Sequence, residues 1–566
     1  MEMKLLKIGD SIFDSQIRGG YYYVDKSLLI KDLFDHPATV TLITRPRRFG
    51  KTLNMYMLKS FFEYNCELRM GNENRQHLFD GLKIAQTGER YMQHFGQYPV
   101  IFLSFKEAKA GTWEVSYQAL KDCIYYEFQR HGNIADSEKL SGADRGIFHR
   151  FLDRAALDSD FPRSIRFLSD CLYAHYGKRV VILIDEYDVP LESSFTGGFY
   201  RQMLELVRSM FSSSLKDSNS LAFAVMTGCL RISKESIFTG LNNPKMVSIL
   251  SAEYSEHFGF TQQEVDDMLQ YYGLESKREE TKDWYDGYLF GKTEVYNPWS
   301  IINYVSNLIT DSSTPPKAHW INSSGNDIVR LLINEVVDSN AQSELETLVK
   351  GGSISKEINE NITYFDAFST VDNLWNMLLF TGYLKRTGDE TDEEGITRTI
   401  LTIPNQEVMT IYRQQIRQWF KSTLTQNKYP QQILAALIAG DVATAEALLS
   451  DLLYKSISYY DSAENFYHGF LTALLTGTNE YEVKSNRETG GGRSDVLLRP
   501  KRGDRMPVII VEIKIATERK DKEAKSEEAL RQIEAGHYAD GFIAEGYPKI
   551  LKYGIAFFKK ECVIKN

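Results

Sequence analysis

The sequence predicts an α/β protein with more than one domain. Apolar, β-rich runs alternate along the first half of the chain with segments of helical periodicity. The runs are residues 39–44, 98–105, 179–191 and 221–228, and the helical segments include 113–130 and 197–215. Apolar strands that alternate with helices are typical of a parallel sheet covered by helices on both faces. The chain has 566 residues, too many for one hydrophobic core, so we expect about two to four domains.

We expect three regions along the chain: 1–310, which contains the alternating strands and helices, 311–430 and 431–566. In the middle region, helix-like segments precede a hairpin with an acidic turn, which is the order of a winged-helix-like module. An ordinary small α+β lid fits equally well. The helical segments expected there are 326–338, 342–350 and 371–380. The last region starts with helices, and its further expected elements are strands near 481, 495 and 508, a charged helix at 521–535 and a strand at 540–544.

Composition and charge exclude several classes of protein. With 43% hydrophobic and 25% charged residues, the chain has the composition of a soluble globular protein. It has no apolar run of about 18 residues, so we expect no membrane span, and its first residues lack the apolar core of a signal peptide. Five cysteines without C-x-x-C spacing favour the reducing cytoplasm and give no zinc site. A net charge of −10 disfavours a generally basic nucleic-acid-binding surface but leaves a local basic groove open.

The stretch TRPRRFGKTL, residues 44–53, resembles a phosphate-binding loop at its end but not at its start. The pattern is G-x-x-x-x-G-K-[ST], and its first glycine falls on Arg45. Backbone N–H groups at a helix N-terminus attract phosphate, and Lys51 after Gly50 adds a full charge. The hydroxyl of Thr52 would bind Mg²⁺. Because the first glycine is lost and a proline follows, a basic turn without nucleotide is the alternative.

A second segment supports a nucleotide site. Residues 179–188, RVVILIDEYD, form an apolar strand that ends in Asp185 and Glu186. In ATPases with this arrangement the aspartate holds Mg²⁺ through water, and the glutamate orients the attacking water. The alternative is a solvated acid pair at the edge of the sheet. The intervening strand at 98–105 is typical of the additional-strand class of P-loop ATPases.

Further residues could contact the phosphates of ATP. The strand at 221–228 ends near Thr227, and Arg231 follows at the place of a sensor residue. Arg47, Arg48 and Arg231 could contact phosphate oxygens directly. Arginines near a turn are, as an alternative, only surface charge.

The segment ETGGGRSDVLLRPKRGDRMPVIIVEIKIA predicts a second centre. In its last strand Val511, Ile513 and Ile515 point one way and Glu512 and Lys514 the other. If this strand pairs with the one at Asp495, the two carboxylates lie side by side. Such a pair could hold Mg²⁺, or alternatively Mn²⁺, beside a lysine, which is a hydrolytic centre for phosphodiesters.

Residues on the helices before and after this strand could also belong to the predicted hydrolytic centre. Glu464 lies on the preceding helix with Tyr467 and His468 on nearly the same face, and Gln532 lies on the following helix. We expect His468 to be a packed or hydrogen-bonded histidine rather than a metal ligand. The alternative for the whole Glu-x-Lys pattern is a solvated strand face.

The motifs together resemble the bacterial AAA-ATPase-like family, whose members carry a C-terminal domain of the PD-(D/E)XK nuclease superfamily. The similar motifs are RPRRFGKTL, LIDEYDVPL, TGCLRISKESIFTGLNN, WYDGYLFG, YNPWS, FTGYL and IPNQEV. The resemblance implies a P-loop NTPase sheet, a mainly helical winged-helix-like middle region and a restriction-endonuclease-like α/β domain at the C-terminus. The resemblance implies that the missing first glycine, here replaced by Arg45, is a feature of the family. For WYDGY and YNPWS we expect aromatic packing around turns.

The resemblance also implies roles for individual residues. The nucleotide residues are Lys51, Thr52, Asp185 and Glu186. The metal and catalytic set of the nuclease is Asp495, Glu512 and Lys514, with Glu464 as the acid on the first helix of that fold. Ser494 stands where the superfamily motif has proline.

We therefore expect a cytoplasmic, ATP-regulated, Mg²⁺-dependent DNA nuclease of defence or mobile-element biology. The alternative is a nucleotide-dependent switch or scaffold that binds DNA through an inactive nuclease fold. Nucleic acid, DNA before RNA, is the expected partner. P-loop ATPases often assemble, so a homo-oligomer stays an open alternative.

Overall fold

The computed structural model consists of two compact units, Met1–Ile328 with Ser353–Thr410, and Val329–Gly352 with Ile411–Asn566. The structure describes residues 3–64, 75–230, 244–320, 341–360, 370–415, 429–455, 464–476, 480–489, 492–501 and 506–566. Each unit is described by itself below. The expected helix at 326–338 lies outside the described residues.

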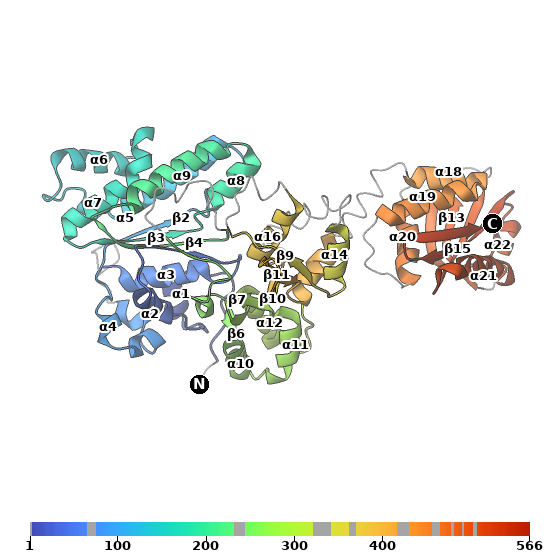
Figure 1. Ribbon diagram of the computed structural model, residues 1–566, viewed down its shortest axis with the longest axis horizontal. Coiled ribbons are helices and arrows are strands. Elements are labelled where there is room, and N and C mark those ends of the chain that lie inside the picture. The colour runs from blue at the N-terminus through green and yellow to red at the C-terminus, as the bar shows by residue number, and fades with distance from the viewer. Residues whose placement is uncertain are drawn as a thin grey trace. The chain divides into compact units, whose positions relative to one another are not determined.

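A five-stranded parallel sheet forms the centre of the first unit, in the order β2-β3-β4-β1-β5. Its strands are β1 Val40–Thr44, β2 Val100–Ser104, β3 Val180–Asp185, β4 Leu221–Gly228 and β5 Lys245–Val247. Helices cover both faces, as Figure 1 shows, with α5–α9 on one side and α1–α4 on the other. These helices are α1 Phe13–Arg18, α2 Leu28–Asp35, α3 Lys51–Phe62, α4 Glu89–Met92, α5 Trp113–Arg130, α6 Gly142–Leu152, α7 Ser164–Tyr176, α8 Val189–Gly197 and α9 Tyr200–Leu215. The predicted parallel sheet with helices on both faces is confirmed.

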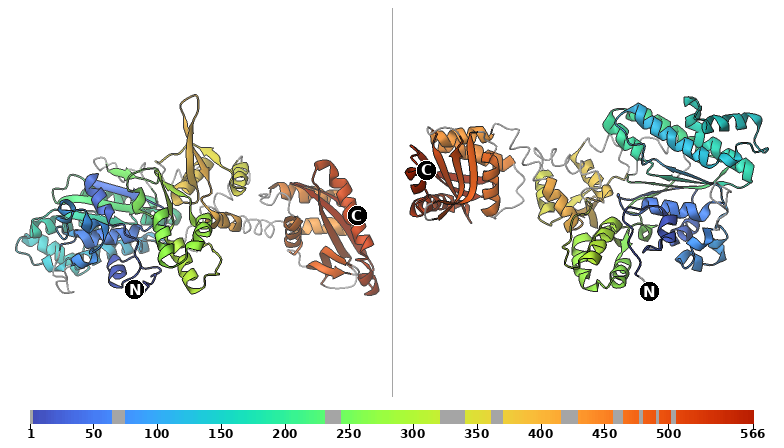
Figure 2. Two further views of the ribbon diagram at one scale, coloured as in Figure 1. Left: turned by 90° about the horizontal axis from the view of Figure 1, so that it is seen from below. Right: turned by 180° about the vertical axis from the view of Figure 1, so that it is seen from behind.

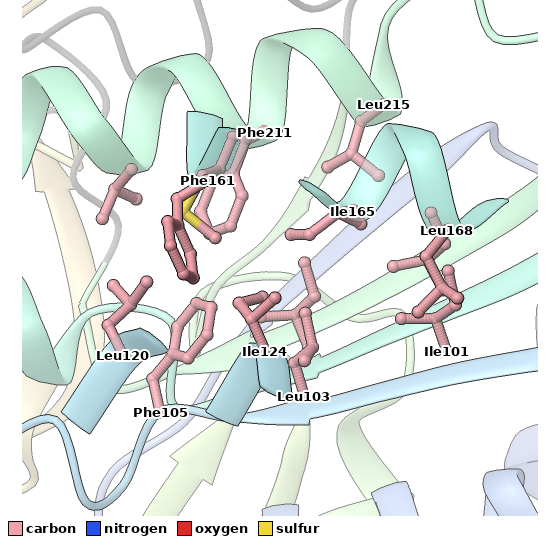
Figure 3. Close-up of a cluster of buried hydrophobic side chains, with 14 of the residues drawn as sticks. Ile101, Leu103, Phe105, Leu120, Ile124, Phe161, Ile165, Leu168, Phe211 and Leu215 are labelled. Atoms are coloured by element: carbon pink, nitrogen blue, oxygen red, sulfur yellow. The ribbon is translucent and has the colours of Figure 1, made fainter. Parts of the chain in front are cut away.

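Burial follows this arrangement of layers. Every residue of β3 is buried, because both of its faces are covered by helices. Figure 3 shows the core between the sheet and the α5–α9 layer, where β2 meets α5, α7 and α9 through Ile101, Leu103, Ile124, Leu168 and Phe211. The apolar run 179–191 is not one strand, since β3 ends at Asp185 and α8 begins at Val189.

Two small antiparallel sheets complete the first unit, in the orders β6-β8-β7 and β10-β11-β9. Their strands are β6 Phe260–Thr261, β7 Tyr288–Phe290, β8 Thr293–Tyr296, β9 Ile354–Lys356, β10 Lys385–Thr391 and β11 Thr397–Thr402. The accompanying helices are α10 Gln262–Tyr271, α11 Arg278–Tyr285, α12 Pro298–Thr310 and α16 Val371–Thr381. The predicted helix at 371–380 and the hairpin with an acidic turn are confirmed. The sequence pattern did not indicate the 260–296 sheet, whose strands are only two to four residues long.

The second unit contains a mixed sheet in the order β12-β13-β14-β15-β16, in which only β14 and β15 are parallel. Helices α18–α20 pack on one face and α21 and α22 on the other. In the right-hand view of Figure 2 the orange helices lie along one side of the red strands. The elements are α14 Ala341–Val349, α18 Tyr429–Ala439, α19 Val442–Lys455, α20 Glu464–Thr476, β12 Tyr481–Thr489, β13 Gly492–Pro500, β14 Val508–Ile515, α21 Lys522–Ala535, α22 Asp540–Ala544, β15 Ile550–Phe558 and β16 Glu561–Lys565.

Most sequence expectations for this unit are confirmed, including the leading helices, the three strands and the charged helix. The strand expected at 540–544 is wrong, because these residues form the short helix α22. Five residues with one buried aromatic, Phe542, do not distinguish helical from strand periodicity.

In the described ranges no helix combines the length and the hydropathy needed to cross a membrane.

A buried carboxyl, Glu407, connects α12 to the chain after β11. Its Oε2 accepts a hydrogen bond from the Ser300 hydroxyl at 2.7 Å, and its Oε1 accepts one from the Trp320 N–H at 2.8 Å. The side chain is completely buried. Burial raises the pKa of Glu407 to about 7, although both hydrogen bonds act in the opposite direction.

This shift predicts a pH dependence of stability. An unfolded glutamate loses its proton near pH 4.5, whereas folded Glu407 keeps its proton to about pH 7. The native state therefore binds the extra proton, and the free energy of unfolding falls as pH rises through this interval, by up to roughly 3 kcal/mol. Glu407→Gln imitates the protonated acid and should remove this loss. Urea unfolding followed by tryptophan fluorescence at pH 5 and pH 8 measures it. The exposed Glu279→Gln is the control, and an equal pH dependence in wild type and Glu407→Gln would contradict the assignment.

Candidate functional site

The loop 45–50 connects β1 to α3 at the carboxyl edge of the parallel sheet. Gly50 is the N-cap of α3 and has a φ of 81°, which glycine adopts without steric cost. The N-terminus of this 12-residue helix presents free backbone N–H groups and the positive end of the helix dipole. The loop therefore has the architecture of an anion site.

Arg45, at the position of the usual first glycine, is completely buried and has a structural role. Its guanidinium donates hydrogen bonds to the carbonyl oxygens of Ser248 at 2.7 Å and Thr44 at 2.9 Å, and to that of Val247 at 3.3 Å. The rings of Phe258 and Phe290 lie 5.5 and 5.1 Å from the guanidinium carbon. Burial lowers the pKa of Arg45 to about 9, so the side chain is still charged at neutral pH. Arg45 thus fixes the start of the loop to the chain after β5.

Residues of the motifs WYDGYLFG (284–291) and YNPWS (296–300) also pack around this loop. The ring of Phe49 contacts those of Tyr288 and Phe290, each at 5.0 Å between centroids. The guanidinium carbon of Arg48 lies 4.2 Å from the ring centre of Trp299. The Asn297 amide donates to the Arg47 carbonyl at 3.4 Å. The aromatic packing expected for WYDGY and YNPWS is present, and the turn that Tyr288 and Trp299 pack against is the phosphate loop.

Lys51 is buried and bonded within its own loop. Its Nζ donates to the carbonyl oxygens of Arg45 and Pro46, both at 2.9 Å, and lies 3.6 Å from the Cys229 sulfur. A phosphate bound to the loop would compete with these carbonyls for the ammonium group.

The structure brings three predicted residues together, from the first turn of α3 and the ends of β3 and β4. The hydroxyl of Thr52 donates to Asp185 Oδ2 at 2.8 Å, and that of Thr227 donates to Asp185 Oδ1 at 2.6 Å. Asp185 is completely buried. A carboxylate and a hydroxyl at this distance are suited to hold a hydrated Mg²⁺ ion.

Two further acids follow Asp185 along the chain. Glu186 has a φ of 53°, and burial together with the neighbouring Asp185 raises its pKa. Asp188 is buried and accepts hydrogen bonds from the backbone N–H groups of Cys229 at 2.8 Å and Leu230 at 3.0 Å. Burial raises the pKa of Asp188 to about 6. The sequence analysis missed its role in holding the segment after β4, although Asp188 stands in the same motif as the predicted acids. Arg231 lies outside the described residues.

A cavity of about 430 Å³ adjoins the loop and is lined by Lys51, Thr52 and Glu186. Apolar and aromatic side chains from the first residues of the chain and from α10 and α12 also line it, among them Leu6, Tyr22, Met268, Trp299 and Ile302. The cavity therefore offers both charged groups suited to phosphate and apolar surface suited to a planar group.

The second unit brings together the predicted carboxylates. Strands β13 and β14 pair antiparallel, with Val496 opposite Val511. Asp495, which precedes Val496, and Glu512, which follows Val511, are therefore neighbours across the two strands. Asp495 Oδ2 accepts the Ile513 N–H at 2.8 Å. The Nζ of Lys514 lies 3.7 Å from Glu512 Oε1, which also accepts a hydrogen bond from Gln532. The expected alternation is confirmed, since Val511 and Ile513 belong to the α18–α20 core on the opposite face.

The environment of Glu512 fits a divalent cation. Burial and the neighbouring Asp495 raise its pKa to about 7. Within the described part of the chain its Oε2 is buried and has no hydrogen-bond partner. A cation beside both carboxylates would bind this oxygen and neutralise the two like charges. No group of three or more acidic, histidine or cysteine side chains suited to a metal occurs among the described residues. The side chain of Glu464, the predicted third acid, is not described.

His468 is a hydrogen-bonded histidine, as expected. Its Nε2 lies 2.7 Å from the backbone carbonyl oxygen of Asp495. The Tyr467 hydroxyl donates to the Lys559 carbonyl at 2.7 Å. The first contact fixes α20 against β13, which carries Asp495, and the second fixes it against the turn between β15 and β16.

Comparisons with known proteins identify relatives of both parts of the chain. A protein of Azotobacter chroococcum mcd 1, described as an uncharacterized protein in the vnfD 5′ region, is 32% identical over 308 residues. The match covers 53% of this chain and 52% of that protein, so the chain spans about half the length of the relative. The family model of the predicted AAA-ATPase matches residues 7–238, and that of the PD-(D/E)XK nuclease superfamily matches residues 462–566. The chain therefore carries a predicted AAA-ATPase-like domain followed by a domain of the PD-(D/E)XK nuclease superfamily.

Proposed function

We propose that the protein is an ATP-regulated, Mg²⁺-dependent DNA nuclease. The observation that carries the proposal is the pair Asp495 and Glu512 on adjacent strands, with Lys514 3.7 Å from Glu512, inside the region that matches the nuclease superfamily. The phosphate loop with Thr52 and Asp185 in hydrogen-bond contact supports the nucleotide part. The proposed setting is the cytoplasm, which the free thiols of the described cysteines support.

In the first unit, the phosphate chain of ATP would lie along the loop 45–50 and the N-terminus of α3. The ammonium group of Lys51 would exchange the carbonyl oxygens of Arg45 and Pro46 for phosphate oxygens. Thr52 and Asp185 would hold Mg²⁺, which neutralises charge on the phosphates, and Thr227 keeps the Asp185 carboxylate in place. Glu186 is the proposed base that orients the attacking water, and its raised pKa makes it a stronger base than an exposed glutamate. Arg48 and Arg231 are proposed phosphate contacts.

In the second unit, Asp495 and Glu512, with Glu464 as the proposed third acid, would hold the metal ion. Mg²⁺ or Mn²⁺ bound there lowers the pKa of water and polarises the scissile phosphate. The Lys514 ammonium group would stabilise negative charge on the attacking oxygen or on the phosphate. Gln532 fixes the Glu512 carboxylate through its hydrogen bond to Oε1.

The nucleotide proposal predicts that Lys51→Ala weakens ATP binding by roughly 10-fold to 100-fold, because a charge-assisted contact to phosphate is lost. Isothermal titration calorimetry with ATP and Mg²⁺ measures the affinity. Lys178→Ala, an exposed lysine away from the cavity, is the matched control. Equal affinities of Lys51→Ala and wild type would contradict the assignment.

The nuclease proposal predicts that Asp495→Ala and Lys514→Ala each lower the rate of DNA cleavage by about 100-fold or more, with folding intact. Single- and double-stranded DNA would be incubated with each variant in Mg²⁺ or Mn²⁺, and circular dichroism would check the fold. Lys552→Ala is the control for Lys514, since Lys552 lies on β15 opposite Ile510, two residues from Glu512.

Cleavage by both variants at the wild-type rate would refute these roles. Salt-sensitive DNA binding by the wild type without metal-dependent cleavage would instead support the alternative, a nucleotide-dependent DNA-binding switch.

A further inference from the structure

Arg48 has an unusual backbone conformation within the phosphate loop. Its φ is 70°, in the left-handed region that residues with a Cβ atom rarely adopt. Its side chain is exposed and lines the cavity next to Lys51. In the described ranges Arg48 has no hydrogen bond or ion pair, and its one ring contact is with Trp299. The loop therefore presents a cation without a hydrogen-bonding partner to the cavity.

The contact with Trp299 leaves this cation able to bind an anion. The guanidinium carbon lies 4.2 Å from the ring centre of the indole, well within the range of a cation–π pair. Stacking uses the flat face of the guanidinium, whereas its N–H donors lie in the plane and point outward. A phosphate oxygen can approach that edge while the indole stays in place.

Trp299 is itself held in position from several sides. The Asn297 side chain caps α12 and accepts the backbone N–H of Trp299 at 3.0 Å. The indole Nε1 donates to the His319 carbonyl at 3.2 Å, and the Trp299 carbonyl accepts from the Asn303 amide at 2.7 Å. Because the Asn297 amide also donates to the Arg47 carbonyl, the start of α12 is connected to the phosphate loop. The ring is thus a fixed surface for a long and otherwise mobile side chain.

The other cations of the loop are already engaged. Arg47 forms an ion pair with Glu192 at 2.7 Å. Lys51 donates to two loop carbonyl oxygens. Of the two arginines that line the cavity, Arg48 is the one that forms no ion pair among the described residues, and the nearby Glu186 carboxylate acts on it only at longer range. Its planar fork of donors matches the oxygens of a phosphate chain.

We propose that Trp299 is a positioning residue that holds the Arg48 guanidinium ready for the phosphate chain of a nucleoside triphosphate. This inference rests on the proposed function, because it requires nucleotide at Lys51. It gives the YNPWS motif a role in ligand binding: without the indole, Arg48 must lose side-chain freedom when the ligand binds, and the affinity falls.

A double-mutant cycle tests the proposal. The affinities of wild type, Trp299→Leu, Arg48→Ala and the double variant would be measured by calorimetry for ATP and for inorganic tripolyphosphate, both with Mg²⁺. We expect each single variant to bind both ligands roughly 3-fold to 30-fold more weakly. The double variant should bind no more weakly than Arg48→Ala, since Trp299 acts through Arg48. Trp299→Tyr should restore most of the affinity, because tyrosine also presents an aromatic face to a cation.

A control variant separates this role from a loss of stability. Trp284→Leu removes a tryptophan that packs against the neighbouring α10–α12 core, and it should leave tripolyphosphate affinity unchanged. An equal loss in Trp284→Leu would overturn the proposal, and so would additive losses in the double variant or an effect of Trp299→Leu on ATP alone. If wild type binds ATP and Trp299→Leu binds it equally well, only this inference fails. If wild type binds neither ligand, the proposed nucleotide site fails as well.

Discussion

The buried guanidinium of Arg45 is the interaction on which the nucleotide half of the molecule depends. A phosphate loop usually begins with a glycine, whose backbone alone permits the turn. Here a side chain defines the start of the loop, by donating to carbonyl oxygens of β1 and of the chain just after β5. The loop conformation is therefore specified by residues about 200 positions later. The aromatic contacts of Phe49 and Arg48 with Tyr288 and Trp299 extend this dependence to α12.

The sequence predicted those features that depend on local pattern and on strand pairing. The parallel sheet followed from alternating apolar runs, and the Asp495–Glu512 pair followed from strand alternation plus one assumed pairing. The roles of Arg45 and Trp299 could not be predicted, because their partners are distant in the chain and no pattern links them. Asp188 was missed for a related reason, since its partners are backbone N–H groups after β4.

The same contacts also connect the proposed nucleotide site with the buried Glu407. Trp299 precedes Ser300, whose hydroxyl is bonded to the buried Glu407. Glu407 lies four residues before Ile411, where the second of the two segments of the second unit begins. A ligand that fixes Arg48 on Trp299 would therefore also act on the start of α12 and, through Ser300, on Glu407.

The most direct test of this account is the ATP affinity of Arg45→Gly, measured beside its free energy of unfolding. The substitution restores the usual glycine but leaves the carbonyl oxygens of Val247 and Ser248 without their buried donor. The account predicts a loss of about 3 kcal/mol or more in unfolding free energy and weaker ATP binding than wild type. Wild-type stability with equal or tighter ATP binding would contradict it, because Arg45 would then be a dispensable departure from the glycine pattern.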